Sequence, residues 1–194
     1  IKFKLMSKTN IKHVLLKNFL KCVLLTPFAI SFINPIALKS GLEFQWDNSD
    51  NFKRLTWYQL NNNKTAKNKV FLFLRKSDRN TGLLKIDVKV PKTFFSKIKA
   101  EKVNLCKVQI GGFSKKTKCI VNIPADIELE KEKNTINIFP SSPIPSSKDN
   151  YAIVLKVTNP NRGGLYQFHS FGQSSGNIPV SFYLGSWTLK LQSF

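Results

Sequence analysis

A serine motif near the C-terminus is the first stretch of this sequence whose residue types could do chemistry. Residues 172–176 read Gly-Gln-Ser-Ser-Gly, the G-x-S-x-G pattern in which a strained strand-to-helix turn exposes a nucleophilic serine, here Ser174. That mechanism needs a parallel α/β context and, in this fold, a histidine after the serine as its base. His169 precedes Ser174 by five residues, and no histidine follows it. The sequence therefore predicts a flexible Gly/Ser hairpin loop and makes a hydrolase the least favoured function.

Metal, cofactor and acid–base sites have no better support. His169 is the only histidine beyond the first 40 residues, and no cysteine or carboxylate stands near it, which argues against a metal site. No phosphate-binding or dinucleotide-binding glycine motif occurs, so we expect no cofactor. The acids of residues 126–132 alternate with Ile127 and Leu129, which indicates an exposed strand face rather than a catalytic pair. We expect a protein that is not an enzyme.

Two of the three cysteines, Cys106 and Cys119, flank a Gly-Gly-Phe-Ser sequence and form a candidate disulfide. If Gly112 and Phe113 make a two-residue type II′ turn, the cysteines face each other directly on antiparallel strands, at a separation that a disulfide bridges. A longer loop would shift the register and separate them. The alternative is a pair of small buried thiols.

The segments that must position these residues are mostly strands. Leu84, Ile86, Val88 and Val90 alternate with polar residues until Pro91, which predicts a strand with these four side chains on one face. Residues 70–74 form a continuous apolar run, typical of a central buried strand. Further strands are expected at residues 42–46, 54–60, 106–110, 119–123, 136–139 and 151–157, a short helix at 92–102, and an extended, solvent-facing connector at 141–149. This pattern predicts an all-β fold, an antiparallel β-sandwich (immunoglobulin-like or related), as a single domain over residues 41–194.

The first 40 residues differ from the rest and are expected to be a cleavable signal helix. Residues 2–21 carry lysines but no acid, and the following apolar run, 23–33, is shorter than the roughly 20 residues of a membrane-spanning helix. Met6 is the predicted true start. The alternatives are a buried amphipathic helix and a retained signal anchor. A cleaved leader predicts export.

The net charge of +20 includes seven lysines of this leader. Residues 41–194 keep 24 basic and 11 acidic side chains, and 20 of the 24 are lysines scattered along the predicted strands. Because phosphate and base recognition favours the bidentate guanidinium of arginine, this composition argues against nucleic acid as a partner. It favours attraction to anionic surfaces.

The C-terminal block, residues 159–191, is rich in aromatic side chains that allow two interpretations. They are either a stacking platform for sugars or other ligands, or the core between two neighbouring strands, which we favour. Arg162 precedes a Gly-Gly pair and suits either a turn cap or contact with a partner. The candidate binding residues are Arg162, Gly163, Gly164, Tyr166, Phe168 and His169.

Three parts of this block resemble a known family. The sequences Asn-Pro-Asn-Arg-Gly-Gly-Leu-Tyr-Gln-Phe at 159–168, Asn-Ile-Pro-Val at 177–180 and Tyr-Leu-Gly-Ser-Trp-Thr-Leu at 183–189 are similar to the closing signature of cyanobacterial exported proteins called domain of unknown function 2808. The match is good over 138–191 and faint before it, and Ile178 departs from the family's Asn-Pro pair. The resemblance implies an exported all-β domain in the periplasm, thylakoid lumen or cell surface. Since the family has no established activity, it supplies no catalytic residues.

These observations favour a non-catalytic exported domain that binds a protein, an envelope polymer or an anionic membrane surface. The second hypothesis is a carbohydrate- or hydrophobic-ligand-binding module that uses exposed aromatic side chains of the C-terminal block. That hypothesis fails if Tyr166, Phe168, Phe171 and Trp187 all point inward.

Overall fold

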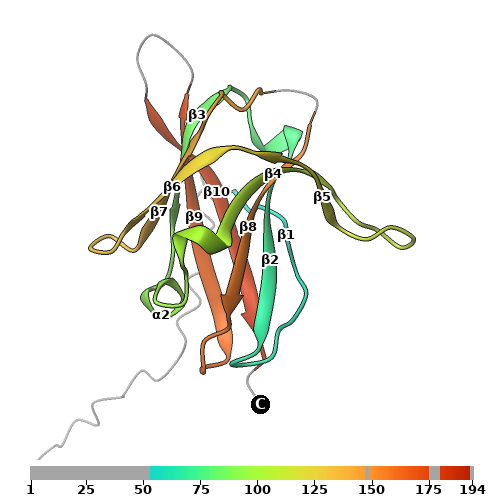
Figure 1. Cartoon of the computed structure of the whole chain (residues 1–194), viewed down its shortest axis with the longest axis vertical. Coiled ribbons are helices and arrows are strands. Elements are labelled where there is room, and N and C mark those ends of the chain that lie inside the picture. Colours follow the sequence, from blue (N-terminus) through green and yellow to red (C-terminus); the bar gives the residue numbers. More distant parts are fainter. Residues whose placement is uncertain (1–52, 147–148, 175–179, 193–194) are drawn as a thin grey trace, which may run out of the picture. The chain divides into compact units, whose positions relative to one another are not determined.

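The computed structural model describes residues 53–146, 149–174 and 180–192, which form two five-stranded antiparallel sheets (Figure 1). This confirms the predicted all-β, antiparallel sandwich. The predicted signal helix at residues 1–40 and the strand expected at 42–46 lie outside the described residues.

Each sheet combines strands that are far apart in sequence. In chain order the elements are β1 (Trp57–Gln59), β2 (Lys67–Leu74), η1 (Lys76–Asp78), β3 (Leu83–Lys89), α2 (Lys92–Phe95), η2 (Ala100–Lys102), β4 (Val103–Gln109), β5 (Lys118–Ile123), β6 (Ala125–Glu130), β7 (Thr135–Pro140), β8 (Tyr151–Thr158), β9 (Gly164–Ser174) and β10 (Ser181–Leu191). Sheet 1 has the order β1-β2-β8-β4-β5, and sheet 2 has the order β10-β9-β3-β7-β6. The predicted helix at residues 92–102 is reduced to the single turn of α2 and the 3₁₀ turn η2.

Apolar side chains from both sheets fill the space between them. They include Val70, Leu72, Leu74, Leu105, Ile153 and Leu155 from sheet 1 and Ile86, Val88, Ile138, Phe168, Trp187 and Leu189 from sheet 2. The indole N–H of Trp187 donates to the backbone carbonyl of Phe73 over 3.0 Å, which ties β10 to β2 across the sandwich. Phe94 of α2 packs edge-on against Tyr166 and Phe168.

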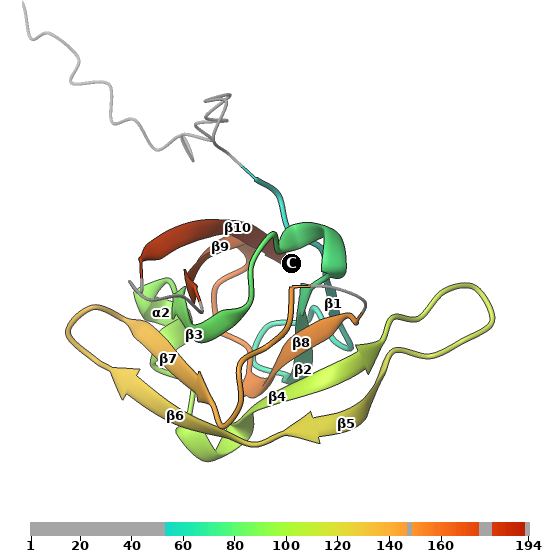
Figure 2. The ribbon, with the colours of Figure 1, turned by 90° about the horizontal axis from the view of Figure 1, so that it is seen from above.

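The chain crosses between the sheets along both sides of the sandwich. On one side β5, the edge of sheet 1, continues through Pro124 into β6, the edge of sheet 2 (Figure 2). On the other side, the backbone of residues 53–55 bonds to Ser186 of β10, and the chain then enters β1 of sheet 1. A proline suits the first crossing because it has no N–H to offer a strand ladder.

Part of the outer face of sheet 1 is also buried. Phe71, Phe73, Cys106, Val108, Ala152 and Val154 form a second buried apolar cluster there. Both faces of β2 are therefore covered, which confirms that the apolar run 70–74 is a central buried strand.

Two details of the predicted pattern were wrong. A β-bulge between Leu83 and Lys85 places Leu83 in the core and leaves Leu84 exposed, so Leu84 does not share the face of Ile86. The connector at 141–149 is not solvent-facing throughout, because Ile144 exchanges two backbone hydrogen bonds with Leu83 and is buried.

Candidate functional site

Strand β9 separates the candidate residues of the C-terminal block onto different surfaces. Successive side chains of a strand point to opposite faces. Tyr166 and Phe168 point inward and are buried, whereas His169 lies half-buried on the outer face. Trp187 of β10 is also buried, which removes three of the four aromatic side chains of the predicted ligand platform. Phe171 remains on the outer face, where its ring packs against Tyr183.

His169 takes part in a hydrogen-bond network that the sequence did not suggest. Ser186 Oγ lies 2.8 Å from His169 Nδ1 and 2.6 Å from Tyr183 Oη. Burial, and secondarily the charge of Lys89, lower the pKa of His169, so the imidazole favours its neutral form. Ser186 is fully buried, and its backbone bonds to residues 53–55. A substrate cannot reach a covered hydroxyl, so we assign this serine–histidine pair a structural role.

The serine motif is not a nucleophile elbow in its described part. Gly172 and Ser174 are the last residues of a regular strand, not a strand-to-helix turn, while residues 175–176 lie outside the described residues. Since five positions separate them along β9, His169 and Ser174 point to opposite faces of the sheet. His169 is therefore not placed to act as a base for Ser174.

Cys106 and Cys119 are joined by a disulfide, with their Cα atoms 5.7 Å apart. The loop between them is not the two-residue turn that would place the cysteines directly opposite each other: Cys106 lies opposite Asn122, and Cys119 lies opposite Val108. The loop is longer, as in the alternative, but the expectation that a longer loop separates the cysteines was wrong. A register shift at Lys107/Val108 keeps them within bonding distance. The disulfide consequently joins diagonal neighbours, and the same shift keeps Val121 from sharing a buried face with Cys119.

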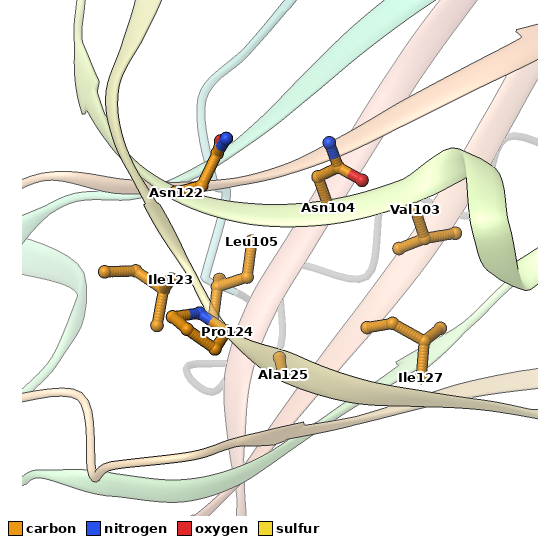
Figure 3. A pocket seen from close by; sticks show the side chains of 8 residues that line it. All are labelled: Val103, Asn104, Leu105, Asn122, Ile123, Pro124, Ala125 and Ile127. Atoms are coloured by element: carbon orange, nitrogen blue, oxygen red, sulfur yellow. The ribbon is translucent and has the colours of Figure 1, made fainter.

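One hollow of about 300 Å³ opens where the chain crosses from β5 to β6 (Figure 3). Six of its eight lining residues are apolar: Val103 and Leu105 of β4, and Ile123, Pro124, Ala125 and Ile127 along the crossing. Asn104 and Asn122 are the only polar residues that line it, and no charged side chain does. A ligand there would find few groups to orient it.

A second hollow, of about 330 Å³, is polar and includes one of the predicted site residues. We call it the Arg162 hollow. Its lining residues are Thr65, Thr93, Ser96, Lys97, Thr158, Asn159, Pro160, Asn161 and Arg162. They come from the β1–β2 loop, from α2 and the residues just after it, and from the β8–β9 turn, which lie at the same end of the sandwich (Figure 1). Four hydroxyl groups, two cations and no carboxylate line this hollow.

Asn159 holds two of these segments together. Its side chain is buried, donates to the carbonyls of Asn61 and Asn63 over 3.2 and 2.8 Å, and accepts from Asn68 Nδ2 over 3.0 Å. The backbone N–H of Thr65 also donates to the carbonyl of Pro160. These bonds fix the β1–β2 loop against the β8–β9 turn and so position Thr65 beside Arg162.

Tyr166 anchors the backbone of Arg162 from beneath. Its hydroxyl donates to the carbonyl of Arg162 over 2.7 Å. Burial raises the pKa of Tyr166, while a hydrogen bond with Thr93 and the charge of Arg162 act against this rise. Gly164 has φ +133°, a conformation that other residues rarely adopt, which lets the chain turn into β9 directly after Arg162. Among the six candidate residues, Tyr166 and the glycines therefore support Arg162, which is itself exposed.

The segments that meet around the Arg162 hollow are basic. Residues 60–67, 91–99, 156–165 and 190–192 meet there, as bonds from Thr65 to Pro160 and from Gln192 to Asn62 show. These segments contain no Asp or Glu and eight basic residues: Lys64, Lys67, Lys92, Lys97, Lys99, Lys156, Arg162 and Lys190. Half of the eight acids of the described residues lie instead on β6 and the β6–β7 turn. Like charges gathered at one end produce a positive potential that attracts anions.

Sequence reasoning found Arg162 but missed the rest of the hollow. Thr65, Thr93, Ser96 and Lys97 are common surface residues in segments far from Arg162, so no local pattern marks them. A signal was nevertheless present, because long stretches of the chain around these residues contain no acid.

Within the part of the chain that the structure describes, His, Cys, Asp and Glu side chains form no group of three or more that could hold a metal ion. No helix in the same part is both long and apolar enough to cross a membrane.

Fold and hollow together define an all-β sandwich domain with a basic end. The chain belongs to the family described as "Protein of unknown function (DUF2808)", whose model matches residues 42–191. No curated protein sequence matches it significantly.

Several solved structures have a similar fold. One is a collagen-binding domain from a Staphylococcus aureus adhesin, with 14% identity, a TM-score of 0.39, and coverage of 71% of this chain and 97% of that chain. Another is BslA, a bacterial hydrophobin, with 10% identity, a TM-score of 0.44, and coverage of 74% of this chain and 97% of that chain. At these identities and TM-scores, the likeness supports no inference about ligands.

Proposed function

We propose that this protein is a non-catalytic exported domain that binds an anionic envelope polymer, of the acidic polysaccharide class, at the Arg162 hollow. The observation that carries the proposal is the lining of the hollow: two cations and four hydroxyl groups without a carboxylate. The guanidinium of Arg162 can pair with a sugar carboxylate through two parallel hydrogen bonds, and Lys97 supplies a second positive charge. Hydroxyl and amide groups suit the hydroxyl groups of a sugar.

A polymer rather than a small molecule suits the surroundings of the hollow. Further basic residues in the segments around it add positive charge, which would attract a polymer that carries many negative charges. Aromatic stacking is not part of the proposal, because Tyr166 and Phe168 are buried. Export is proposed from the basic and apolar pattern of residues 1–40, with the periplasm, thylakoid lumen or cell surface as destinations. The absence of catalysis is proposed from the covered Ser186 and from the separation of Ser174 and His169.

The test measures binding of the protein to polygalacturonate by titration calorimetry, with neutral dextran as the comparison polymer. Charge-assisted hydrogen bonds contribute about 1.5–3 kcal/mol, so we expect Arg162→Ala to weaken binding roughly tenfold or more. Lys97→Ala should weaken it less, because a lysine acts as a point charge. Binding should also weaken as the salt concentration rises.

Lys131→Ala is the matched control, since Lys131 is an exposed lysine on the β6–β7 turn, outside the acid-free segments. Equal effects of Lys131→Ala and Arg162→Ala would show that general charge attracts the polymer without a defined site. Equal binding of dextran and polygalacturonate would contradict the proposal that the ligand is anionic.

A further inference from the structure

The β4–β5 hairpin projects from the sandwich, and Figures 1 and 2 show it extending away from the body in both views. Its loop, residues 110–117, joins Gln109 of β4 to Lys118 of β5. The loop is ordered by its own hydrogen bonds: Gly112 N–H donates to the carbonyl of Lys115, and Gly111 N–H donates to Thr117 Oγ1. The tip therefore has a defined conformation at a distance from the Arg162 hollow.

The tip presents an aromatic side chain fully to solvent. Phe113 has a relative exposure of 112%, the highest among the eight exposed large apolar side chains of the described residues. Two others of the eight, Ile120 at 56% and Val121 at 50%, lie on β5 of the same hairpin. An isolated exposed apolar residue is ordinary, but an aromatic residue at the tip of a projecting hairpin is the arrangement that lets a protein enter the boundary of a lipid layer.

Positive charge surrounds this aromatic side chain. Lys115, Lys116 and Lys118 are all exposed, and residues 104–122 contain no acid. Lys107, nearer the body, is paired with Asp149 over 2.8 Å and is not counted among the available charges. Lysines near an aromatic tip are complementary to anionic lipid headgroups, and their long stems let the ammonium groups stay at the headgroup level while the ring goes deeper.

The β6–β7 hairpin provides a comparison within the same molecule. It also projects, on the opposite side in Figure 2, but its turn has the sequence Lys131-Glu132-Lys133-Asn134 with no aromatic residue. Asp126, Glu128 and Glu130 add acids along its first strand, and Glu130 pairs with Lys133. A projecting hairpin in this fold is therefore not basic and apolar by default.

The disulfide gives the β4–β5 hairpin a firm base. It joins Cys106 of β4 to Cys119 of β5, and Cys106 is fully buried in the outer cluster of sheet 1. The tip is thereby tethered to the sandwich through a covalent link as well as through the strand ladder. A preformed tip loses less conformational entropy when it binds.

We infer that the β4–β5 hairpin is a membrane-contact element, in which Phe113 inserts into the headgroup region of an anionic lipid bilayer while Lys115, Lys116 and Lys118 bind the lipid headgroups. This contact is separate from polymer binding at the Arg162 hollow and does not depend on it. The domain would then bind the membrane with one surface and the envelope polymer with another.

The test is co-sedimentation of the protein with vesicles of phosphatidylglycerol and phosphatidylcholine, compared with vesicles of phosphatidylcholine alone. We expect binding to the anionic vesicles and much weaker binding to the neutral ones. Phe113→Ala should lower the partition coefficient at least tenfold, from the loss of a buried aromatic ring. Replacing Lys115, Lys116 and Lys118 with glutamine should lower it about a hundredfold, at roughly fivefold per lysine. None of these side chains belongs to the core, so circular dichroism spectra should match that of the unchanged protein.

Matched controls separate insertion from general attraction. Leu165→Ala removes an exposed apolar side chain elsewhere, and Lys131→Gln removes a lysine from the other hairpin; both should leave vesicle binding unchanged. A Phe113→Trp variant should show additional fluorescence quenching by brominated lipids, beyond that of the native tryptophans.

Three outcomes would overturn the inference. One is the absence of binding to anionic vesicles, which would favour an acidic protein as the partner of the hairpin. The second is unchanged binding of Phe113→Ala. The third is loss of vesicle binding in Arg162→Ala but not in Phe113→Ala, which would show that the membrane contacts the basic end. Polymer binding is measured separately, so its failure leaves this inference standing.

Discussion

Replacing Asn159 with alanine tests whether a buried amide organises the basic end of the sandwich. The variant removes two hydrogen bonds donated to the carbonyls of Asn61 and Asn63 and one accepted from Asn68. Each such bond contributes about 1 kcal/mol net, and a buried donor left without a partner costs about 1–3 kcal/mol more. Because Asn68 is itself buried and loses the acceptor of its Nδ2, we expect a decrease of about 4–6 kcal/mol in the free energy of unfolding.

Urea unfolding followed by tryptophan fluorescence measures this change. The midpoint should fall while the slope with denaturant stays the same, since the variant alters stability rather than the surface exposed on unfolding. Asn161→Ala is the control, because Asn161 is exposed on the same turn and should change the free energy of unfolding by no more than about 0.5 kcal/mol. The double variant with Asn68→Ala should be less destabilised than the sum of the two single variants, since they share a bond.

Two results would refute this account. If Asn159→Ala lowers the free energy of unfolding by less than about 1 kcal/mol, water replaces the lost bonds and the amide is not a clamp. If the two single variants are additive, the bond between Asn68 and Asn159 contributes nothing measurable. A confirmed clamp also predicts weaker polygalacturonate binding by Asn159→Ala at temperatures where the variant stays folded.

Three further predictions concern other parts of the molecule. Mass spectrometry of the non-reduced protein should find Cys106 linked to Cys119, and free thiols at these positions would contradict the disulfide. Replacing both cysteines with alanine should lower the free energy of unfolding by about 3 kcal/mol, because the disulfide closes a loop with a sequence separation of 13. Burial holds the pKa of His169 below its unfolded value of about 6.5, so the neutral imidazole stabilises the fold above that pH, and this stabilisation is lost as the pH falls through the lower folded pKa. His169→Gln should therefore make the free energy of unfolding depend less on pH below about 6.5. An unchanged pH dependence would refute the lowered pKa of His169. Gly185 lies at a β-bulge of β10 and has φ +138°, and an added Cβ would lie 2.6 Å from the carbonyl oxygen of Lys53. Gly185→Ala should therefore lower the melting temperature markedly, whereas a change of only about a degree would show that this bulge adapts.

The sequence predicted the strands whose alternation is regular. In β6, Ile127 and Leu129 pack against the core while Asp126 and Glu128 are exposed, as the period of two requires. The continuous apolar run of β2 was correctly assigned to a buried position. These patterns depend on each strand alone, which is why they can be read locally.

Register and bulges could not be predicted in the same way. The β-bulge between Leu83 and Lys85 buries Leu83 and exposes Leu84. Leu83 pairs there with Ile144, which is far along the chain and cannot be identified from the strand alone. The diagonal pairing of Cys106 with Cys119 likewise depends on a β-bulge that the sequence of neither strand indicates.

The candidate site was predicted only in part, for the same reason. Arg162 stood out beside its glycines, but the other walls of its hollow come from segments that meet only once both sheets have formed. A sharper prediction would have required knowing that Asn159 bonds to the β1–β2 loop.

The sheet order also determines when the fold can form during synthesis. The centre of sheet 1 pairs β2 with β8, and the centre of sheet 2 pairs β9 with β3, so each joins an early segment of the chain to a late one. Before residues 151–174 are made, strands β3, β7 and β6 of sheet 2 can already pair, whereas sheet 1 has only the separate pairs β1–β2 and β4–β5. Pairing across so many residues is intrinsically slow. The growing polypeptide thus lacks β8 and β9, which both sheets need, until synthesis is nearly complete.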